Sequence, residues 1–284
     1  MRLIKRLLMM MLVAAVLVLP VFAADAPKVV KEGNRHINAK DRAEVVYIPA
    51  GEFTMGSKPG VGEYDEQPEH KVDLDGYWIY QTEVTVAQYR QFCQATGRSM
   101  PNAPPWGWKE DHPIVNVTWD DATAYAKWAG AALPTEAQWE KVARGTDGRV
   151  YPWGNTWPPP PGVGNFADET AKRTYTDWPI VFGYDDGYTQ AAPVGRFPAG
   201  ASPYGALDMA GNVWEWCADW YGPYTAAPAK NPTGPADGSY RVLRGGSWYY
   251  YIATDFRCAD RNWYNPSYGN YYYGFRCIVL SPGP

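Results

Sequence analysis

The sequence predicts a single, loop-rich α+β domain with little regular secondary structure, on three observations. The chain of 284 residues contains 14 Trp, 22 Tyr, 28 Gly and 26 Pro, a mixture that favours a body held by aromatic clusters over long regular elements. Three short helices with clear start signals stand among short apolar runs. No internal repeat or change of composition divides the chain, so we expect one domain over residues 45–284.

The first residues have the pattern of an export signal. A basic start precedes an apolar run, which ends at Val21-Phe-Ala23 in the small-x-Ala form of a cleavage site. The basic residues are Arg2, Lys5 and Arg6. We expect residues 1–23 to be a cleaved signal peptide, which places the protein in the periplasm without stable membrane insertion. An uncleaved membrane anchor is the alternative.

Cleavage after Ala23 removes three cations and no acids, so the formal net charge falls from −4 to −7. Nucleic acid is therefore not an expected partner, because its phosphates repel an acidic chain. Residues 24–44 are polar and charged with little periodicity, and we expect them to form a flexible leader before the folded body.

The folded body is expected to begin and end with short strands. Strands are predicted over residues 45–48, 53–55, 77–80, 241–243 and 275–280. Residues 56–70 are expected to form a polar loop. The Trp-Pro-Pro-Pro-Pro-Gly run over residues 157–162 cannot be a helix or a central strand. From residue 150 onward we therefore expect mostly loops and short strands.

Three threonines predict the starts of three helices, because a threonine side chain can cap the first free backbone N–H groups. Two of them also begin a capping box. The expected helices cover residues 86–95 after Thr85, 119–129 after Thr118 and 136–144 after Thr135. Gly97 and Gly145 are expected to end the first and the third.

Four cysteines suggest two disulfides in an exported chain, since the number is even. They are Cys93, Cys217, Cys258 and Cys277. The sequence alone leaves three connectivities open, and free buried thiols are the alternative.

The run from Asp208 to Trp216 places the carboxylate of Glu215 between two tryptophans. A buried carboxylate needs a cation or several donors. Gly211 and Asn212 allow a positive-φ backbone, which turns carbonyls inward. Carbonyls and carboxylates together suit calcium. A glycine-rich corner in which Glu215 pairs with an arginine is the alternative.

Ten short motifs in a fixed order identify a family. Among them are Gly51-Glu-Phe-Thr-Met-Gly56, Leu133-Pro-Thr-Glu-Ala-Gln-Trp-Glu140, Asp208-Met-Ala-Gly-Asn-Val-Trp-Glu-Trp216, Arg244-Gly-Gly-Ser-Trp248 and Gly274-Phe-Arg276. With these motifs the chain resembles the formylglycine-generating-enzyme, or sulfatase-modifying-factor, family over residues 45–280. The resemblance implies the formylglycine-generating-enzyme fold, a remote relative of the C-type lectin fold.

The resemblance also implies two structural calcium sites. By position, the first would use the side chains of Asn165 and Asp186 with the carbonyls of Phe166 and Tyr188. The second would use the side chains of Asp208 and Glu215 with the carbonyls of Met209, Gly211 and Val213. Cys258 matches a structural cysteine of the family. We expect one disulfide between Cys217 and Cys258 and another between Cys93 and Cys277.

The chain departs from the family at the copper site. Formylglycine-generating enzymes carry two reactive cysteines shortly after the Arg-Gly-Gly-Ser step, and these thiolates bind copper(I). Here Tyr250 stands at the first position and no cysteine stands at the second. Copper and sulfatase activation are therefore not expected, and the sequence identifies no other redox cofactor.

We expect the pocket beside the Arg-Gly-Gly-Ser segment. The candidate catalytic residues are Ser247, Tyr250 and Arg244, and the candidate substrate-binding residues are Trp248, Arg257 and Arg261. Alternatively, Ser247 is a turn serine and the arginines at 257 and 261 are structural ion-pair partners. The tyrosine runs at 249–251 and 271–273 either pack internally or form a flat wall for a planar ligand.

One exported branch of the family shares the signal, the size and the missing copper cysteines, namely the branch that matures pyoverdine-type siderophores. The resemblance therefore predicts a periplasmic oxidoreductase that oxidises the dihydro-chromophore of a small-molecule or peptide siderophore precursor. A noncatalytic binding or structural module of the same fold, and a sulfatase-activating formylglycine generator, are the alternatives.

Overall fold

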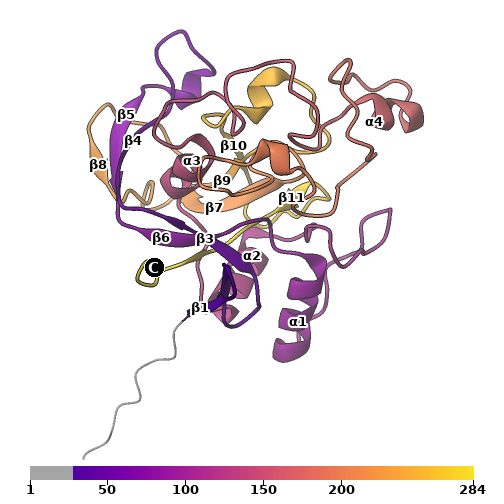
Figure 1. The fold of residues 1–284 in the computed structure, drawn as a ribbon, viewed down its shortest axis with the longest axis horizontal. Coiled ribbons are helices and arrows are strands. Elements are labelled where there is room, and N and C mark those ends of the chain that lie inside the picture. Colours follow the sequence, from indigo (N-terminus) through magenta and orange to yellow (C-terminus); the bar gives the residue numbers. More distant parts are fainter. Residues whose placement is uncertain (1–27) are drawn as a thin grey trace, which may run out of the picture.

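The computed structural model describes residues 28–284, which form a loop-rich body of small sheets and short helices (Figure 1). The expected signal peptide lies outside the described residues. None of the described helices is long and apolar enough to span a membrane.

The expectation of a flexible leader is wrong for residues 28–44. Strands β1 (Val29–Glu32) and β2 (Arg35–Asn38) form an antiparallel hairpin, and β2 pairs with β3 (Glu44–Ile48). Asp41 fixes this segment, because its buried carboxylate accepts hydrogen bonds from Tyr80 Oη at 2.6 Å and Tyr125 Oη at 2.5 Å. Long-range polar contacts thus order a segment whose local composition is that of a leader.

Three sheets form the body. The remaining strands are β4 (Gly51–Met55), β5 (His70–Leu74), β6 (Tyr77–Tyr80), β7 (Trp214–Trp220), β8 (Ala229–Lys230), β9 (Arg241–Arg244), β10 (Asn262–Tyr264), β11 (Tyr273–Gly274) and β12 (Ile278–Val279). Their orders are β1-β2-β3-β6-β12, β10-β9-β7-β11 and β4-β5-β8. The first sheet is antiparallel throughout, whereas the β11–β7 and β5–β8 pairs are parallel.

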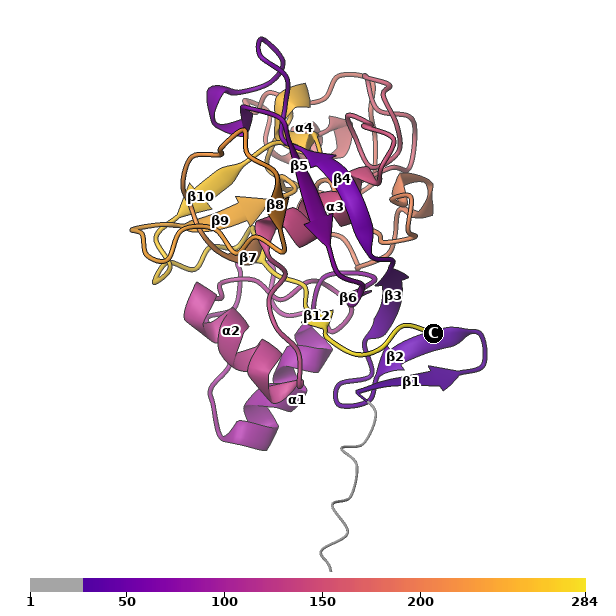
Figure 2. The same cartoon turned by 90° about the vertical axis from the view of Figure 1, so that its left-hand side faces the viewer.

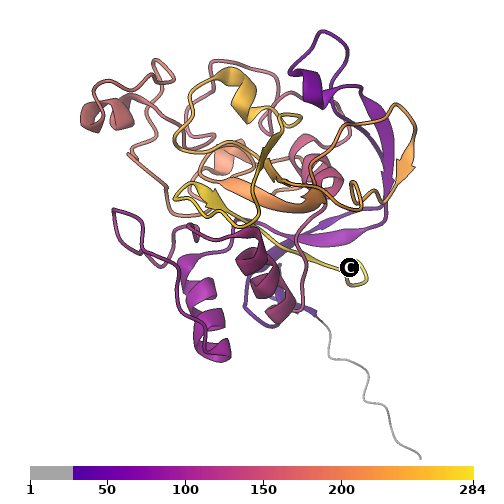
Figure 3. The ribbon, with the colours of Figure 1, turned by 180° about the vertical axis from the view of Figure 1, so that it is seen from behind.

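The three predicted helices are confirmed. They are α1 (Val86–Thr96), α2 (Trp119–Trp128) and α3 (Glu136–Arg144), and each begins with a capping box at its threonine. Figure 2 shows α1 and α2 side by side, below β7. Between α3 and β7 the chain runs mostly as loops, as Figure 3 shows from behind, with α4 (Glu169–Thr174) and the 3-10 turn Pro198–Gly200. Two further 3-10 turns are η1 (Tyr64–Glu66) and η3 (Ala253–Phe256).

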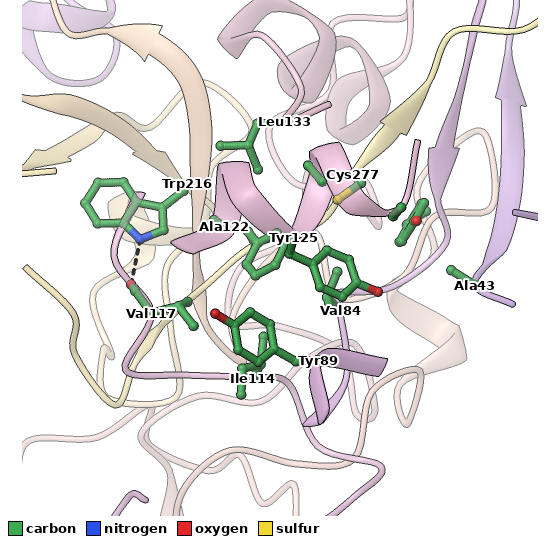
Figure 4. Close-up of a cluster of buried hydrophobic side chains, with 14 of the residues drawn as sticks. Ala43, Val84, Tyr89, Ile114, Val117, Ala122, Tyr125, Leu133, Trp216 and Cys277 are labelled. Atoms are coloured by element: carbon green, nitrogen blue, oxygen red, sulfur yellow. Dashed lines mark hydrogen bonds between the residues drawn. The ribbon is translucent and has the colours of Figure 1, made fainter. Parts of the chain in front are cut away.

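Aromatic rings fill the core where α1 and α2 meet the sheets. The rings of Tyr89 and Tyr125 are stacked with centroids 5.7 Å apart, and Phe275 packs edge-on against both. Figure 4 shows Trp216 beside this cluster, where its Nε1 donates to the carbonyl of Val117 at 3.1 Å. This core anchors β7, and β7 carries the Trp-Glu-Trp run.

Candidate functional site

The Arg-Gly-Gly-Ser segment leaves β9 through two glycines that no other residue could replace easily. Gly245 and Gly246 have φ values of 100° and 74°, where a side chain is strained. A Cβ on Gly246 would also lie 2.8 Å from the carbonyl oxygen of Asp255. This close approach brings the segment directly under η3.

Ser247 is fully buried, and its Oγ accepts a hydrogen bond from the backbone N–H of Tyr249 at 3.4 Å. This contact is that of a turn serine, which is the alternative named for it. Ser247 therefore lies in the segment where the pocket was expected, but its buried side chain is not exposed to a ligand in this structure.

Arg244 lies in an ion-pair network and not in a pocket. It is fully buried, and its Nη2 donates to Glu140 at 2.6 Å and to the carbonyl of Cys258 at 2.7 Å. Burial opposes its charge, but Glu140 and its other neighbours raise the pKa of Arg244 above the usual range. Such a buried, paired cation stabilises the fold, and Arg244 lines neither of the cavities of about 760 and 330 Å³.

The two expected substrate-binding arginines are also ion-paired. Arg261 donates from Nε and Nη2 to Glu136 at 2.6 and 2.9 Å. Arg257 donates from Nη2 to the buried Glu66. Arg261 is thus a structural ion-pair partner, as the alternative reading of the sequence had it. Arg257 is ion-paired too, but it also lines a cavity of about 760 Å³. Ser247, Trp248 and Tyr250 do not line this cavity.

Aromatic side chains gather instead around Trp248. The members of this Trp248 aromatic surface are Trp106, Trp178, Trp248, Tyr249, Tyr271 and Tyr272. Trp178 and Tyr271 are each stacked with Trp248, with ring centroids 5.9 and 6.1 Å apart. Trp248 is 2% exposed, whereas Tyr249 and Tyr271 are 43% and 38% exposed. A buried ring thus supports an accessible aromatic layer, and aromatic faces of this kind stack well on flat rings.

Two members of this surface come from loops that the sequence did not single out. Trp106 lies between α1 and α2, and Trp178 follows α4. Both stand in tryptophan-rich stretches, but nothing local shows that these stretches meet the Arg-Gly-Gly-Ser segment. Only the tertiary fold brings them together.

Tyr250 is the residue that the family resemblance places at the first copper cysteine. It is half-buried and packs edge-on against Trp214 and Tyr272, with centroids 5.5 and 6.4 Å apart. Burial raises the pKa of its hydroxyl. An aromatic contact thus replaces a thiolate at this point.

The residues of the first expected calcium site fit a cation. Asn165 Oδ1 is buried and has no hydrogen-bond partner among the described residues. Burial and then the neighbouring charge of Asp168 raise the pKa of Asp186 to about 8. The carboxylate of Asp186 accepts hydrogen bonds from the backbone N–H groups of Phe166 at 2.9 Å and Tyr188 at 2.7 Å, and its oxygens keep further lone pairs, unlike Glu215, which is paired with an arginine. A calcium ion held by Asn165, Asp186 and the carbonyls of Phe166 and Tyr188 would satisfy the orphan oxygen of Asn165 and the charge of Asp186.

The second expected site fits less well. Both oxygens of Glu215 are taken, since Arg276 donates to each at 2.7 Å and Trp139 Nε1 donates to Oε2 at 2.9 Å. Glu215 therefore has the arginine partner that was the alternative. Asp208 Oδ1 is buried without a partner among the described residues, as is Oε2 of Glu83, which the sequence did not suggest. The carbonyls of Met209, Gly211 and Val213 belong to the same turn. No three His, Cys, Asp or Glu side chains of the described chain form a metal site by themselves.

The four cysteines are free, buried thiols in this structure, so neither expected disulfide is formed. Cys93 Sγ donates to the carbonyl of Ser99 at 3.5 Å, and Cys217 Sγ contacts the carbonyl of Glu215 at 4.0 Å. Cys217 and Cys258 lie in one buried cluster, and Cys93 and Cys277 lie in another.

Comparisons with known proteins cover most of the described chain. Residues 32–280 match the family described as sulfatase-modifying factor enzyme 1-like domain. A formylglycine-generating enzyme of Streptomyces coelicolor is 34% identical over 307 residues, which cover 90% of this chain and 95% of the relative. The hercynine oxygenase of Mycolicibacterium smegmatis is 33% identical over 267 residues, covering 78% of this chain and 58% of the relative. The solved structure of PvdO from Pseudomonas aeruginosa has a TM-score of 0.72 at 26% identity and covers 90% of this chain and 99% of its own.

Proposed function

This chain belongs to the sulfatase-modifying factor, or formylglycine-generating-enzyme, family, and on that basis we propose that it oxidises the dihydro-chromophore of a pyoverdine-type siderophore precursor. In this proposal the protein is exported to the periplasm, and its substrate is a small-molecule or peptide precursor. The similarity to PvdO over nine-tenths of the chain supports this branch of the family, and the similarity to an oxygenase supports oxidative chemistry in general.

The Trp248 aromatic surface is the observation that carries the proposal. Two of its members, Trp248 and Tyr249, lie on the segment where the family resemblance places the copper cysteines, and no cysteine stands between Ser247 and Arg257. Stacked aromatic pairs gain about 0.5–1.5 kcal/mol beyond the burial of their area. The exposed rings of Tyr249 and Tyr271 can therefore bind a planar, conjugated chromophore in preference to a flexible aliphatic chain.

The proposed oxidation removes two electrons and two protons from the chromophore and forms one new double bond. We take dioxygen, reduced to hydrogen peroxide, as the acceptor. Half-buried Tyr250 and the aromatic layer would exclude water from one face of the bound ring. Calcium at Asn165 and Asp186 would stabilise the fold and take no part in the redox step.

A clean deletion in the source organism, followed by mass spectrometry of its siderophores, tests the proposal. We expect a precursor two hydrogens heavier than the mature siderophore, with restoration by the wild-type gene. Tyr249→Ala combined with Tyr271→Ala should fail to restore maturation. Trp263→Ala is the matched control, because Trp263 is also aromatic and 40% exposed but lies on β10. Normal mature siderophore in the deletion strain would end the proposal.

A noncatalytic binding module is the second candidate, because the expected catalytic groups Ser247 and Arg244 are fully buried. Purified protein, dihydro-precursor and dioxygen distinguish the two candidates. Oxidised product and hydrogen peroxide in equal amounts indicate the enzyme, whereas tight binding without product indicates the module.

A further inference from the structure

We propose that a second ligand site, the Arg144–Arg257 cavity, binds an organic anion through the guanidinium groups of Arg144 and Arg257. The cavity has a volume of about 760 Å³ and lies between β4, β5 and the C-terminal end of α3. This volume is in the usual range of small-molecule sites. The cavity shares no lining residue with the Trp248 aromatic surface, and the inference does not depend on the proposed oxidation.

Arg144, the last residue of α3, is held rigidly in the cavity wall. Its Nη1 donates to the carbonyls of Thr54 at 3.1 Å and Gly56 at 2.7 Å, and to Glu140 at 2.9 Å. Its Nη2 makes no hydrogen bond with any described residue, and the side chain keeps 10% exposure. One end of the guanidinium is therefore fixed and the other is free for a ligand.

Arg257, which follows η3, is held in the same way. Its Nη2 donates to Glu66, its Nη1 has no partner within the described chain, and the side chain is 10% exposed. Gly62 packs directly against Nη1 and covers one side of it, so that a side chain at residue 62 would clash with the guanidinium. Two pre-oriented guanidinium groups thus line one cavity, and such groups bind carboxylates and phosphates with paired hydrogen bonds.

Buried ion pairs lie beneath the cavity. Four arginines meet three glutamates there: Arg144, Arg244, Arg257 and Arg261 with Glu66, Glu136 and Glu140. Three other carboxyls adjoin this group, and burial is the first cause that raises the pKa of each, well above the usual range for Asp260, to about 7 for Asp219 and to about 6 for Asp255. Asp255 is mostly ionised at neutral pH and offsets the fourth guanidinium, so the anion would be held by the unpaired Nη atoms of Arg144 and Arg257 and not by a net charge of this group.

Charges at the rim are nearly balanced and do not oppose this ligand. Lys71 is paired with Glu52 at 3.0 Å, and Asp147 with Arg149 at 2.7 Å. Lys58 and Glu69 also line the cavity. Val61, Val150, Ala226 and Pro228 add apolar wall. The fitting ligand is therefore a carboxylate or a phosphate monoester on an apolar or aromatic body.

Isothermal titration of the mature chain with three probes of one shape tests the site. Benzoate carries a carboxylate, phenyl phosphate carries a phosphate, and benzamide is neutral. We expect at least one of the anions to bind about tenfold more tightly than benzamide, because hydrogen bonds between charged partners are worth about 1.5–3 kcal/mol. The tighter anion identifies the ligand class.

Two variants of adjacent exposed loop residues make the test specific to the cavity. Ala226 lines the cavity, whereas Ala227 lines a neighbouring cavity of about 330 Å³. Ala226→Trp should weaken anion binding about tenfold or more, and Ala227→Trp should leave it unchanged. Equal binding of benzamide, no binding of either anion, or full binding by Ala226→Trp would overturn the proposal.

Discussion

Buried charged residues decide much of this structure at the scale of the single residue. Glu215 and Arg276 are fully buried and bonded through both carboxylate oxygens. Arg276 also donates to the carbonyl of Leu207 at 2.9 Å. The pair therefore joins β7, the turn before it and the C-terminal segment.

Replacing Arg276 should destabilise the protein strongly. Arg276→Met leaves a buried carboxylate without its cation, a change that costs about 3–5 kcal/mol in the free energy of unfolding. Urea denaturation measures this loss. Arg35→Met is the control. Arg35 is exposed and its ion pair with Glu44 is long, at 3.5 Å, so no measurable loss of stability is expected. Equal stability of the Arg276 variant and wild type would contradict the assigned role.

Asp219 should make stability depend on pH. Burial and then the charge of Glu136 raise its pKa to about 7 from an ordinary value of 3.8. The folded state holds this proton more tightly than the unfolded state, so the contribution of Asp219 to stability falls as pH rises from about 4 to about 7.

The measurement is the free energy of unfolding at several pH values, for wild type and for Asp219→Asn. The asparagine can still accept the hydrogen bond that the backbone N–H of Glu136 donates at 2.8 Å. The stability difference between variant and wild type should grow in favour of the variant over this pH range. Parallel pH profiles would show that Asp219 does not titrate there.

The N-terminal hairpin is an element that inspection of the sequence does not predict, because its contacts are made far along the chain. Most residues of this segment are polar, yet Asn38 at the end of β2 and Asp41 just after it are each 1% exposed. Asn38 Nδ2 donates to Tyr80 Oη at 2.6 Å and to the carbonyl of Ala129 at 3.0 Å. Partners 42 and 91 residues away cannot be recognised from the segment itself.

Asp41→Ala should release this element. It leaves the buried hydroxyls of Tyr80 and Tyr125 without an acceptor, and we expect a loss of about 2–4 kcal/mol in unfolding free energy, since each unpaired buried group costs about 1–3 kcal/mol. Hydrogen–deuterium exchange should also become faster in β1 and β2. Asp41→Asn keeps an acceptor and should retain most of the protection. Unchanged exchange in the alanine variant would show that the hairpin is held by other contacts.

At the scale of the whole molecule, the fold expected from ten ordered motifs is confirmed by the family match over residues 32–280 and by the PvdO structure, which covers 90% of this chain. The proposed calcium acts at this scale, because it would join the loop at Asn165 to the loop at Asp186. A ligand at one hundred times its dissociation constant stabilises the native state by about 2.7 kcal/mol. Chelation should therefore lower the melting temperature.

Asp186→Ala should abolish the response of the melting temperature to calcium. Asp185→Ala is the matched control, because Asp185 is the adjacent residue but pairs with Arg173 at the surface. If chelation leaves the melting curve unchanged and elemental analysis finds no calcium, the protein does not bind calcium at Asn165 and Asp186.

The sequence by itself determined the family, the fold and the three capped helices, because motifs and capping boxes are written within a few neighbouring residues. Only the tertiary structure decided the ion-pair partners of Glu215, Arg244 and Arg261, and the aromatic residues that pack around Trp248. Arg276 is 61 residues from Glu215, and Arg261 is 125 residues from Glu136. A charge can be recognised locally, but whether it meets a counter-charge, a metal or a ligand depends on segments that folding alone brings together.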